Sequence, residues 1–455
     1  MPTYRTPDVY VEEISVFPPS VAEVETAIPA FIGYTGQARK VSAGDLSNRP
    51  TKIYNFAEYE QYFGGPDAPD IDVALVADGP GFIATVTPPD ITYLMYYAVK
   101  MFFDNGGGKC YIVSVGGYAD AIDLADFTAG LDAVALEDEP TLLVCPEAVQ
   151  LGGTGYDTMS QNMLIQCGTL KDRFAILDLF GGEAAQDNTA LTANRARVGN
   201  NNLKYGALYY PFLRSSFNHA VTDLGTNVNV TIDGGAAATL DTLQTTATAA
   251  FNAAKAALLD HYIVLPPSGA VAGVYAATDT ARGVWKAPAN VGLADVVEPT
   301  VRLDNAHQDE LNVDATTGKS INAIRAFAGK GTLVWGARTL AGNDNEWRYV
   351  PVRRFFNMVE ESVKKSTYWA VFEPNDANTW VKVRGMIENY LTQKWREGAL
   401  AGATTKDAFF VRCSLGTTMN AQDILEGRMN VEIGMAAVRP AEFIVLKFSH
   451  KLQTS

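Results

Sequence analysis

One short motif in this chain has the residue types of a phosphate-binding loop. Thr317-Gly318-Lys319-Ser320 resembles the end of such a loop. The loop also needs a glycine five positions before Gly318, so that successive backbone amides can surround a phosphate. That position is Val313, and no buried strand leads into it. We therefore interpret 317–320 as a surface turn.

Two glycine clusters could suggest a dinucleotide site, in which a strand must come first and a helix second. Gly106 to Gly108 follows a predicted helix and precedes a predicted strand, so we interpret it as a helix stop. The segment 152–155 (GGTG) has the correct order of elements but lacks the G-x-G-x-x-G spacing. It is predicted to be an ordinary loop.

The other reactive residue types form no recognisable catalytic or metal-binding pattern. There is no G-x-S-x-G motif, and the acidic groups 137–139 and 373–376 lie in polar runs that predict solvated turns. Cys110 and Cys145 lie in apolar strand-like runs, typical of buried, inert thiols. No C-x-x-C pair or metal-ligand spacing occurs among the cysteines and histidines, which are Cys110, Cys145, Cys167, Cys413, His219, His261, His307 and His450. We expect no catalytic residue, no cofactor and no metal.

Composition indicates a globular protein with several domains. The chain has 455 residues, of which 47% are hydrophobic and 19% are charged, so two or three domains are expected. Its net charge of −15 argues against a broad nucleic-acid surface. No apolar run is long enough to cross a bilayer, and no secretory signal opens the sequence. We expect synthesis and folding in a cytoplasm, without direct contact with membrane or nucleic acid.

The first two thirds of the chain alternate strand and helix signals, which predicts an α/β layer with parallel crossovers. The segment 219–260 is rich in Ala, Thr, Asp, Asn and Gly, with a hairpin signal at 227–235, and we interpret it as a surface elaboration. The segment 266–292 is interpreted as packed turns around a short helix. Buried strands are predicted at 27–34, 110–115, 141–145, 174–179 and 205–210, and helices at 92–104 and 157–170.

The chain after residue 345 predicts a compact α+β domain. Apolar residues at helical spacing (Val352, Phe355, Phe356, Val359 and Val363) indicate one helix, and 379–396 indicates a second. Strands are expected at 408–414, 429–434 and 441–448. Basic residues cluster here, against the acidic trend of the chain. They are interpreted either as solvated helix faces or as a contact with an acidic protein partner.

Both ends of the chain carry extended, strand-prone segments outside any predicted core. Such strands need an edge to pair with, and a neighbouring subunit can supply one. We therefore expect inter-subunit contacts from the apolar residues of these two arms, which are Val9, Tyr10, Val11, Ile14, Phe443, Ile444, Val445, Leu446 and Phe448.

Ordered blocks along nearly the whole chain resemble contractile tail sheath proteins of phages and of phage-tail-like injection particles. The likeness is strongest in 334–340 (VWGARTL) and 347–354 (WRYVPVRR). The segment 219–260 is outside it. The other blocks are 7–14 (PDVYVEEI), 26–35 (TAIPAFIGYT), 266–275 (PPSGAVAGVY), 285–290 (WKAPAN), 321–325 (INAIR), 371–375 (VFEPN) and 440–443 (PAEF).

The resemblance implies a structural subunit that forms stacked, hexameric rings around an inner tube and contracts to drive the tube through a target envelope. It implies partners in the tube protein, the baseplate and terminal cap proteins, and strand exchange through the arms. The expected organisation is an N-terminal arm (1–22), an outer α/β domain (23–340), an inner α+β domain facing the tube (341–435) and a C-terminal arm (436–455). Candidate tube-facing residues are Arg353, Arg354, Lys364, Lys365, Lys382 and Arg384.

Two other classes remain open from the residues alone. One is a non-contractile capsid or surface-layer type of assembly protein, and the other is a diverged α/β enzyme. An enzyme would need a convergent polar pocket, whereas an assembly protein would need complementary surfaces.

Overall fold

The computed structural model describes residues 20–87, 89 and 91–444, and these divide into two compact units. Unit 1 holds residues 20–24 and 359–438, and unit 2 holds residues 25–358 and 439–444. The chain therefore starts in unit 1, builds unit 2, returns to unit 1 and ends again in unit 2.

A nine-stranded sheet forms the centre of unit 2, and its strand order is β13-β16-β15-β8-β7-β6-β1-β5-β2. The run from β15 to β5 is parallel, whereas β13, β16 and β2 pair antiparallel at the two sides. This confirms the predicted α/β layer. The strands are β1 (Pro29–Tyr34), β2 (Thr51–Ile53), β5 (Cys110–Gly116), β6 (Leu142–Val144), β7 (Phe174–Asp178), β8 (Gly206–Tyr210), β13 (Val291–Gly292), β15 (Asn322–Phe327) and β16 (Gly331–Val334).

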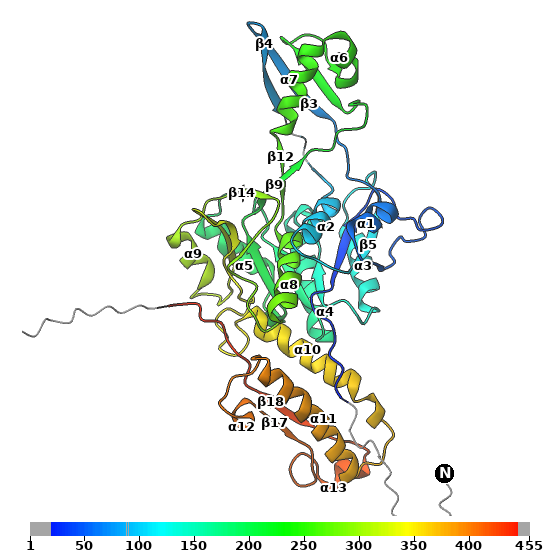
Figure 1. The fold of residues 1–455 in the computed structure, drawn as a ribbon, viewed down its shortest axis with the longest axis vertical. Helices are drawn as coiled ribbons and strands as arrows, with labels where there is room; N and C mark the ends of the chain where they lie inside the picture. Colours follow the sequence, from blue (N-terminus) through cyan, green and yellow to red (C-terminus); the bar gives the residue numbers. More distant parts are fainter. Residues whose placement is uncertain (1–19, 88, 90, 445–455) are drawn as a thin grey trace, which may run out of the picture. The chain divides into compact units, whose positions relative to one another are not determined.

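Helices cover both faces of this sheet, as a buried parallel sheet requires. In β1, Phe31 enters one apolar cluster with α1, α2 and α8, while Ile32 enters the other with α3, α4 and α5. Figure 1 shows these helices around the sheet. The helices near this sheet are α1 (Phe56–Phe63), α2 (Met95–Asp104), α3 (Leu124–Ala135), α4 (Gly152–Leu170), α5 (Asn188–Arg197), α8 (Ser268–Arg282) and α9 (Asn305–Asn312). Short 3₁₀ turns lie at Pro146–Gln150 and Leu203–Tyr205.

Helices α2 and α8 approach each other so closely that two positions must be glycine. A Cβ atom at Gly269 would lie 2.4 Å from the carbonyl oxygen of Ala98, and one at Gly273 would lie 2.5 Å from that of Phe102. Neither contact is possible for a side chain without moving a backbone. The segment 266–292 was predicted to be packed turns around a short helix. The helix is longer than predicted, because α8 takes up 15 residues, and turns follow it from Gly283.

Each of these two helices begins at a buried carboxylate that follows a central strand. Glu147 accepts hydrogen bonds from the N–H groups of Leu94 and Met95 at 2.8 and 3.0 Å, and from that of Tyr34 at 2.8 Å. Asp178, at the end of β7, accepts one from the N–H of Ser268 at 2.7 Å. Burial raises the pKa of each carboxyl group by more than these hydrogen bonds lower it, so that both pKa values are about 7.

The predicted loop at 152–155 is instead the first turn of α4, so that prediction was wrong. Gly152 adopts a φ of +70°, and a Cβ atom at Gly153 would lie 2.8 Å from the guanidinium of Arg197. The positive φ accounts for Gly152, and the approach of Arg197 accounts for Gly153, so the tertiary context overrides the poor helix propensity of glycine in this turn. The predicted helix stop at 106–108 is confirmed, because α2 ends at Asp104 and Gly106 has a φ of +91°.

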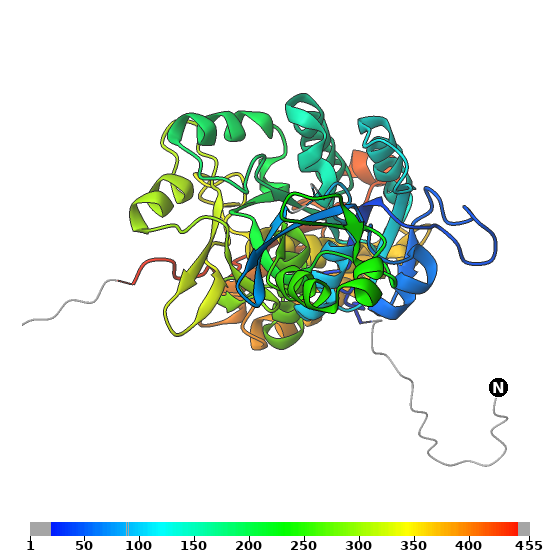
Figure 2. The ribbon, with the colours of Figure 1, turned by 90° about the horizontal axis from the view of Figure 1, so that it is seen from above.

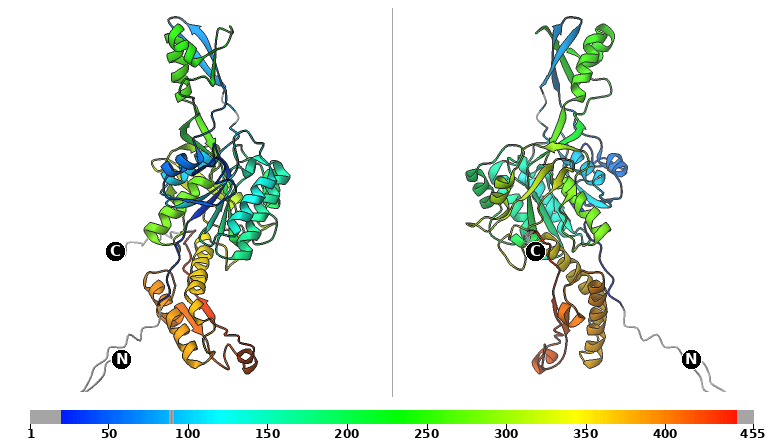
Figure 3. Two further views of the ribbon diagram at one scale, coloured as in Figure 1. Left: turned by 90° about the vertical axis from the view of Figure 1, so that its right-hand side faces the viewer. Right: turned by 60° about the vertical axis from the view of Figure 1, so that its left-hand side comes forward.

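The segment 219–260 folds together with a hairpin from a distant part of the chain. The predicted hairpin is confirmed as the antiparallel pair β10–β11, but β10 also pairs in parallel with β3. The blue and green segments lie side by side in Figure 1, Figure 2 and Figure 3. The sequence analysis did not predict the other hairpin, which is formed by residues 71–87. The elements are β3 (Ile71–Asp78), β4 (Gly81–Thr87), β10 (Val228–Ile232), β11 (Ala238–Thr239), α6 (Leu240–Thr246) and α7 (Thr248–Leu259).

A separate three-stranded sheet joins β9 (Leu213–Asn218), β12 (Tyr262–Leu265) and β14 (Val296–Pro299).

Unit 1 contains two long helices and a two-stranded sheet. Both predicted helices are confirmed, with Val359 buried in the first and Val383 and Leu391 in the second. The predicted strand at 441–448 was wrong for 441–444, which form no strand, and the rest lies outside the described residues. The elements are α10 (Val350–Ser366, which enters unit 1 at residue 359), a 3₁₀ turn (Tyr368–Ala370), α11 (Ala377–Arg396), α12 (Thr405–Ala408), β17 (Phe409–Arg412), α13 (Ala421–Leu425) and β18 (Glu432–Met435).

Replacement of Glu147 by alanine is expected to destabilise unit 2 by roughly 3 kcal/mol, because three buried N–H groups lose their acceptor. The loss should be larger at pH 5.5 than at pH 8. A carboxyl group whose pKa is raised in the folded state contributes stability at low pH and loses it as the pH rises through about 7. Thermal and denaturant unfolding of the disassembled subunit would measure this, with the exposed Glu183→Ala as the control. Equal stability of Glu147→Ala and the control would contradict the capping role.

Candidate assembly interface

The residues that resemble a phosphate-binding loop are committed to internal contacts. Lys319 Nζ donates a hydrogen bond to the carbonyl of Arg195 at 2.6 Å, and Ser320 Oγ donates to that of Asn312 at 2.6 Å. Lys319 and Ser320 are buried, so the prediction of a surface turn holds only for the exposed Thr317. The arrangement joins α5 to the segment before β15 and leaves no phosphate cradle.

The cysteines are buried, and Glu139 is bound by other residues of the subunit. All four cysteines are free and buried, and burial raises the pKa of each thiol. Glu139 was predicted to lie in a solvated turn, but it binds Lys52, Lys109 and the hydroxyl of Tyr111. Burial alone would raise the pKa of Glu139, but the hydrogen bonds from Lys109, Lys52 and Tyr111 outweigh this effect and lower the pKa to about 2.

Among the described residues, no group of three or more His, Cys, Asp and Glu could hold a metal ion. No helix in that part of the chain is long and apolar enough to cross a membrane.

The basic cluster divides into buried and exposed residues. Arg353 is 2% exposed, donates to Asn357 at 2.7 Å and stacks on Trp347, while Arg354 is 4% exposed and forms an ion pair with Asp279. These two arginines therefore stabilise unit 2 and present little surface to a partner.

Four of the six candidate tube-facing residues reach the surface of unit 1. The side chains of Lys364 and Lys365 are 55% and 31% exposed, and both contact Glu361. Arg384 on α11 is 41% exposed, and Lys382 on the same helix is exposed. Of the six candidates, these four are the ones accessible to a partner.

The sheet of unit 1 has only two strands within the described residues. Phe409 pairs with Met435 and Arg412 with Glu432, so each strand has a single partner strand. Figure 3 shows α11 beside this sheet. A groove of about 340 Å³ lies between α11 and β17, lined by Glu388, Thr392, Thr405, Lys406 and residues 409–411. Two-stranded sheets are marginally stable alone, and a free strand edge is a template for a further strand.

The end of the predicted N-terminal arm and the residues just after it are held by unit 1. The N–H groups of Ala22 and Val24 donate to Ser366 Oγ and Ser362 Oγ at 3.0 Å each, and Glu23 forms an ion pair with Lys394. The predicted arm residues Val9, Tyr10, Val11 and Ile14 lie outside the described residues.

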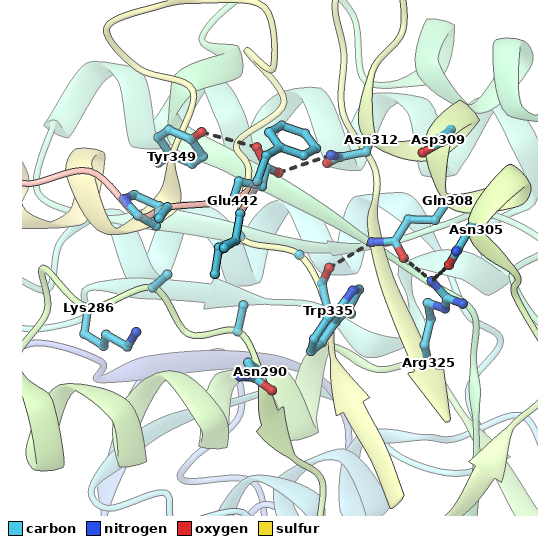
Figure 4. Close-up of a pocket in the computed structure, with 18 residues that line it drawn as sticks. Lys286, Asn290, Asn305, Gln308, Asp309, Asn312, Arg325, Trp335, Tyr349 and Glu442 are labelled. Carbon is cyan, nitrogen blue, oxygen red and sulfur yellow. Dashed lines mark hydrogen bonds between the residues drawn. The ribbon is translucent and has the colours of Figure 1, made fainter. Parts of the chain in front are cut away.

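The described residues 439–444 of the predicted C-terminal arm belong to unit 2. Pro440 to Ile444 form one wall of a groove of about 600 Å³, whose other lining residues include Trp335, Arg325 and Lys286. Figure 4 shows Glu442 hydrogen-bonded to Asn312 and Tyr349. Phe443 and Ile444 are 71% and 79% exposed, and the predicted arm residues Val445, Leu446 and Phe448 lie outside the described residues.

The sequence analysis assigned no role to Glu442. A possible signal was present, since this carboxylate stands alone in the apolar run Ala441 to Leu446. A charge within an apolar segment requires a partner when it is buried. The identity of that partner, Arg338, could not be found without the fold.

Comparisons with known proteins agree in describing tail sheaths. Residues 165–340 match the family described as phage tail sheath protein central domain, and residues 342–451 match that described as phage tail sheath C-terminal domain. Two curated tail sheath proteins, from Vibrio phage KVP40 and Enterobacteria phage T4, are 30% identical over 131 residues and 24% identical over 190 residues. These regions are 28% and 40% of this chain but only 19% and 27% of the phage proteins.

Two solved structures are similar over nearly the whole chain. The helical sheath of the anti-feeding prophage (AFP) in its contracted state is 32% identical, with a TM-score of 0.69, covering 99% of this chain and 100% of that one. The contracted sheath complex of the extracellular contractile injection system PVC is 30% identical, with a TM-score of 0.67 and 99% coverage of both chains. On this full-length similarity, supported by both matching domains, the chain belongs to the family of contractile tail sheath proteins.

Proposed function

We propose that this chain is the structural subunit of a contractile sheath that polymerises helically around an inner tube and contracts to drive the tube through a target cell envelope. The observation that carries this proposal is the similarity to the AFP helical sheath across almost all of both chains. The role requires no catalytic residue and no cofactor. Lys319 and Glu139 are bound to other residues of the subunit, and the four cysteines are buried.

The proposed partners are further copies of the chain in stacked hexameric rings, the tube protein, the baseplate and terminal cap proteins. A chain of the AFP baseplate, whose structure was 6-fold symmetrised, is 31% identical to this one. Assembly in a bacterial cytoplasm would precede incorporation into a phage virion or a phage-tail-like particle, either released or retained by the cell.

The two-stranded sheet of unit 1 supports polymerisation by strand addition. In this proposal, arms from neighbouring subunits extend the sheet along the free edges of β17 and β18, and an arm strand covers the groove beside β17. Backbone hydrogen bonds then give affinity, and alternating side chains give register. Each subunit would both donate and accept strands, so the contact propagates instead of closing.

The proposed domain arrangement keeps 23–340 outside and 341–435 on the inner wall, facing the tube. The exposed basic residues Lys364, Lys365, Lys382 and Arg384 would then supply charge complementarity to an acidic tube surface. Such a contact sets register without a large apolar patch that would aggregate the free subunit.

Deletion of residues 2–19 tests the strand-addition step. The truncated chain keeps the described contacts of residues 20–24 and should remain folded, but it should form no tubes because it cannot donate its N-terminal strand. Negative-stain electron microscopy and analytical ultracentrifugation would compare it with the full-length chain. The reverse result, long tubes from the truncated chain, excludes strand exchange through this arm.

Reversal of Lys364 and Lys365 to glutamate tests the tube contact. We expect co-sedimentation with the tube protein to weaken by about tenfold at low ionic strength, and by less at high salt, where charges are screened. Sheath-only polymers should persist. The matched control reverses the exposed Lys255 and Lys330 of unit 2, which changes net charge equally. If both double variants bind the tube alike, unit 1 does not face the tube through α10.

A further inference from the structure

The carboxylate of Glu442 is held by side chains from three other segments of unit 2. Arg338 binds it in a bidentate manner, with Nε 2.8 Å from Oε1 and a terminal nitrogen 2.5 Å from Oε2. Asn312 Nδ2 donates to Oε1 at 3.1 Å, and the hydroxyl of Tyr349 donates to Oε2 at 3.2 Å. Bidentate, charge-assisted pairs of this kind are both strong and directional.

Arg338 is itself fixed to the central sheet. It is 3% exposed, and its third guanidinium nitrogen donates to the carbonyl of Asn312 at 3.0 Å. Its backbone N–H and C=O both bind the side-chain amide of Asn322, each at 2.8 Å. Asn322 is the first residue of β15 and pairs with Tyr209 of β8. Two interactions therefore connect Glu442 to the nine-stranded sheet.

The path from the sheet to Glu442 requires a glycine at one position. A Cβ atom at Gly336 would lie 2.7 Å from Oδ1 of Asn322, the atom that accepts from the Arg338 N–H. The close approach of the chain to Asn322 is possible only without a side chain there. Three sequence blocks thus help to hold the carboxylate of a fourth (440–443): 334–340 and 347–354 contact it directly, and 321–325 acts through Arg338.

The contacts end abruptly after this residue. The side chain of Glu442 is 22% exposed, whereas Phe443 and Ile444 are mostly exposed. Burial would raise the pKa of Glu442, but the hydrogen bonds and charge of Arg338 hold that pKa below its usual range, so the carboxylate is ionised at neutral pH. Among the described residues of the C-terminal arm, Glu442 is therefore the last one whose side chain is held by several polar contacts, and it is charged.

We propose that Glu442 is the anchor of the C-terminal arm, and that Arg338, Asn312 and Tyr349 position the arm for its neighbouring subunit. The proposal rests on the proposed function, in which the arm pairs with another subunit. Fixing the start of a short strand lowers the entropy lost when the strand docks, so the anchor favours polymerisation without touching the partner. The two arms then start on different units, the N-terminal one on unit 1 and the C-terminal one on unit 2.

The test removes the charge of the anchor in the full-length chain. In Glu442→Gln, an amide N–H₂ must replace one carboxylate oxygen, and it cannot accept a hydrogen bond from Arg338. The matched control is Asp309→Asn, which removes one charge from an exposed residue lining the same groove. Tyr349→Phe removes a single hydrogen bond and should give a smaller effect than Glu442→Gln.

The first measurement is made on the disassembled subunit. Nitroxide labels on Ile444→Cys and Thr316→Cys, both exposed sites of unit 2, give an inter-spin distance distribution by double electron-electron resonance. We expect a narrow distribution in the wild-type and Asp309→Asn backgrounds and a much broader one with Glu442→Gln. An unchanged width with Glu442→Gln would overturn the anchor, whatever the polymers do.

The second measurement is the yield of tubes from unlabelled protein. Glu442→Gln should lower it by roughly tenfold relative to wild type and Asp309→Asn, as expected for the loss of one charge-assisted pair. A broadened distance distribution with a normal tube yield would refute the link from anchor to assembly. Wild-type protein that forms no tubes under any condition would contradict the proposed function instead, and the spin-label result would still decide the anchor.

Discussion

The close packing of α2 against α8 beneath a sheet buried on both faces is the constraint on which unit 2 depends. Parallel strands leave no face for water, so both faces need helices within contact distance. Gly269 and Gly273 allow the two helix backbones to meet, and the carboxylates of Glu147 and Asp178 satisfy their first N–H groups. Without acceptors there, the buried ends of these helices would leave unpaired donors, which are costly in an apolar interior.

The sheet formed in this way also serves as the support for the chain's last contacts. Strand β15 carries Asn322, which holds the backbone of Arg338, which in turn holds Glu442. The last described residues of the chain are thus connected to the central sheet. The start of the other arm depends instead on Ser362, Ser366 and Lys394 of unit 1.

Several charged residues of this acidic chain hold its own segments together. Arg353 and Arg354 fix the start of α10, Glu139 joins Lys52 to Lys109, and Arg195 and Lys319 bind each other's backbone carbonyls. Long cationic side chains suit this role because they can reach several carbonyls across a packed interface. The residues that remain available to partners are fewer than the sequence suggested, and on α10 and α11 they include Lys364, Lys365, Lys382 and Arg384.

The sequence by itself determined the central strands, the long helices and the family. Patterns such as Ala27 to Tyr34 and Val352 to Val363 were sufficient, because local hydrophobic periodicity reports which face of an element is buried. Only the tertiary structure decided that the hairpin 71–87 completes the sheet of β10, that Gly153 belongs to a helix, and that Arg338 meets Glu442. Each of these depends on a contact between residues far apart in the chain, or on packing against a neighbour. No local pattern encodes such a pairing, since its free energy exists only once the fold has brought both partners together.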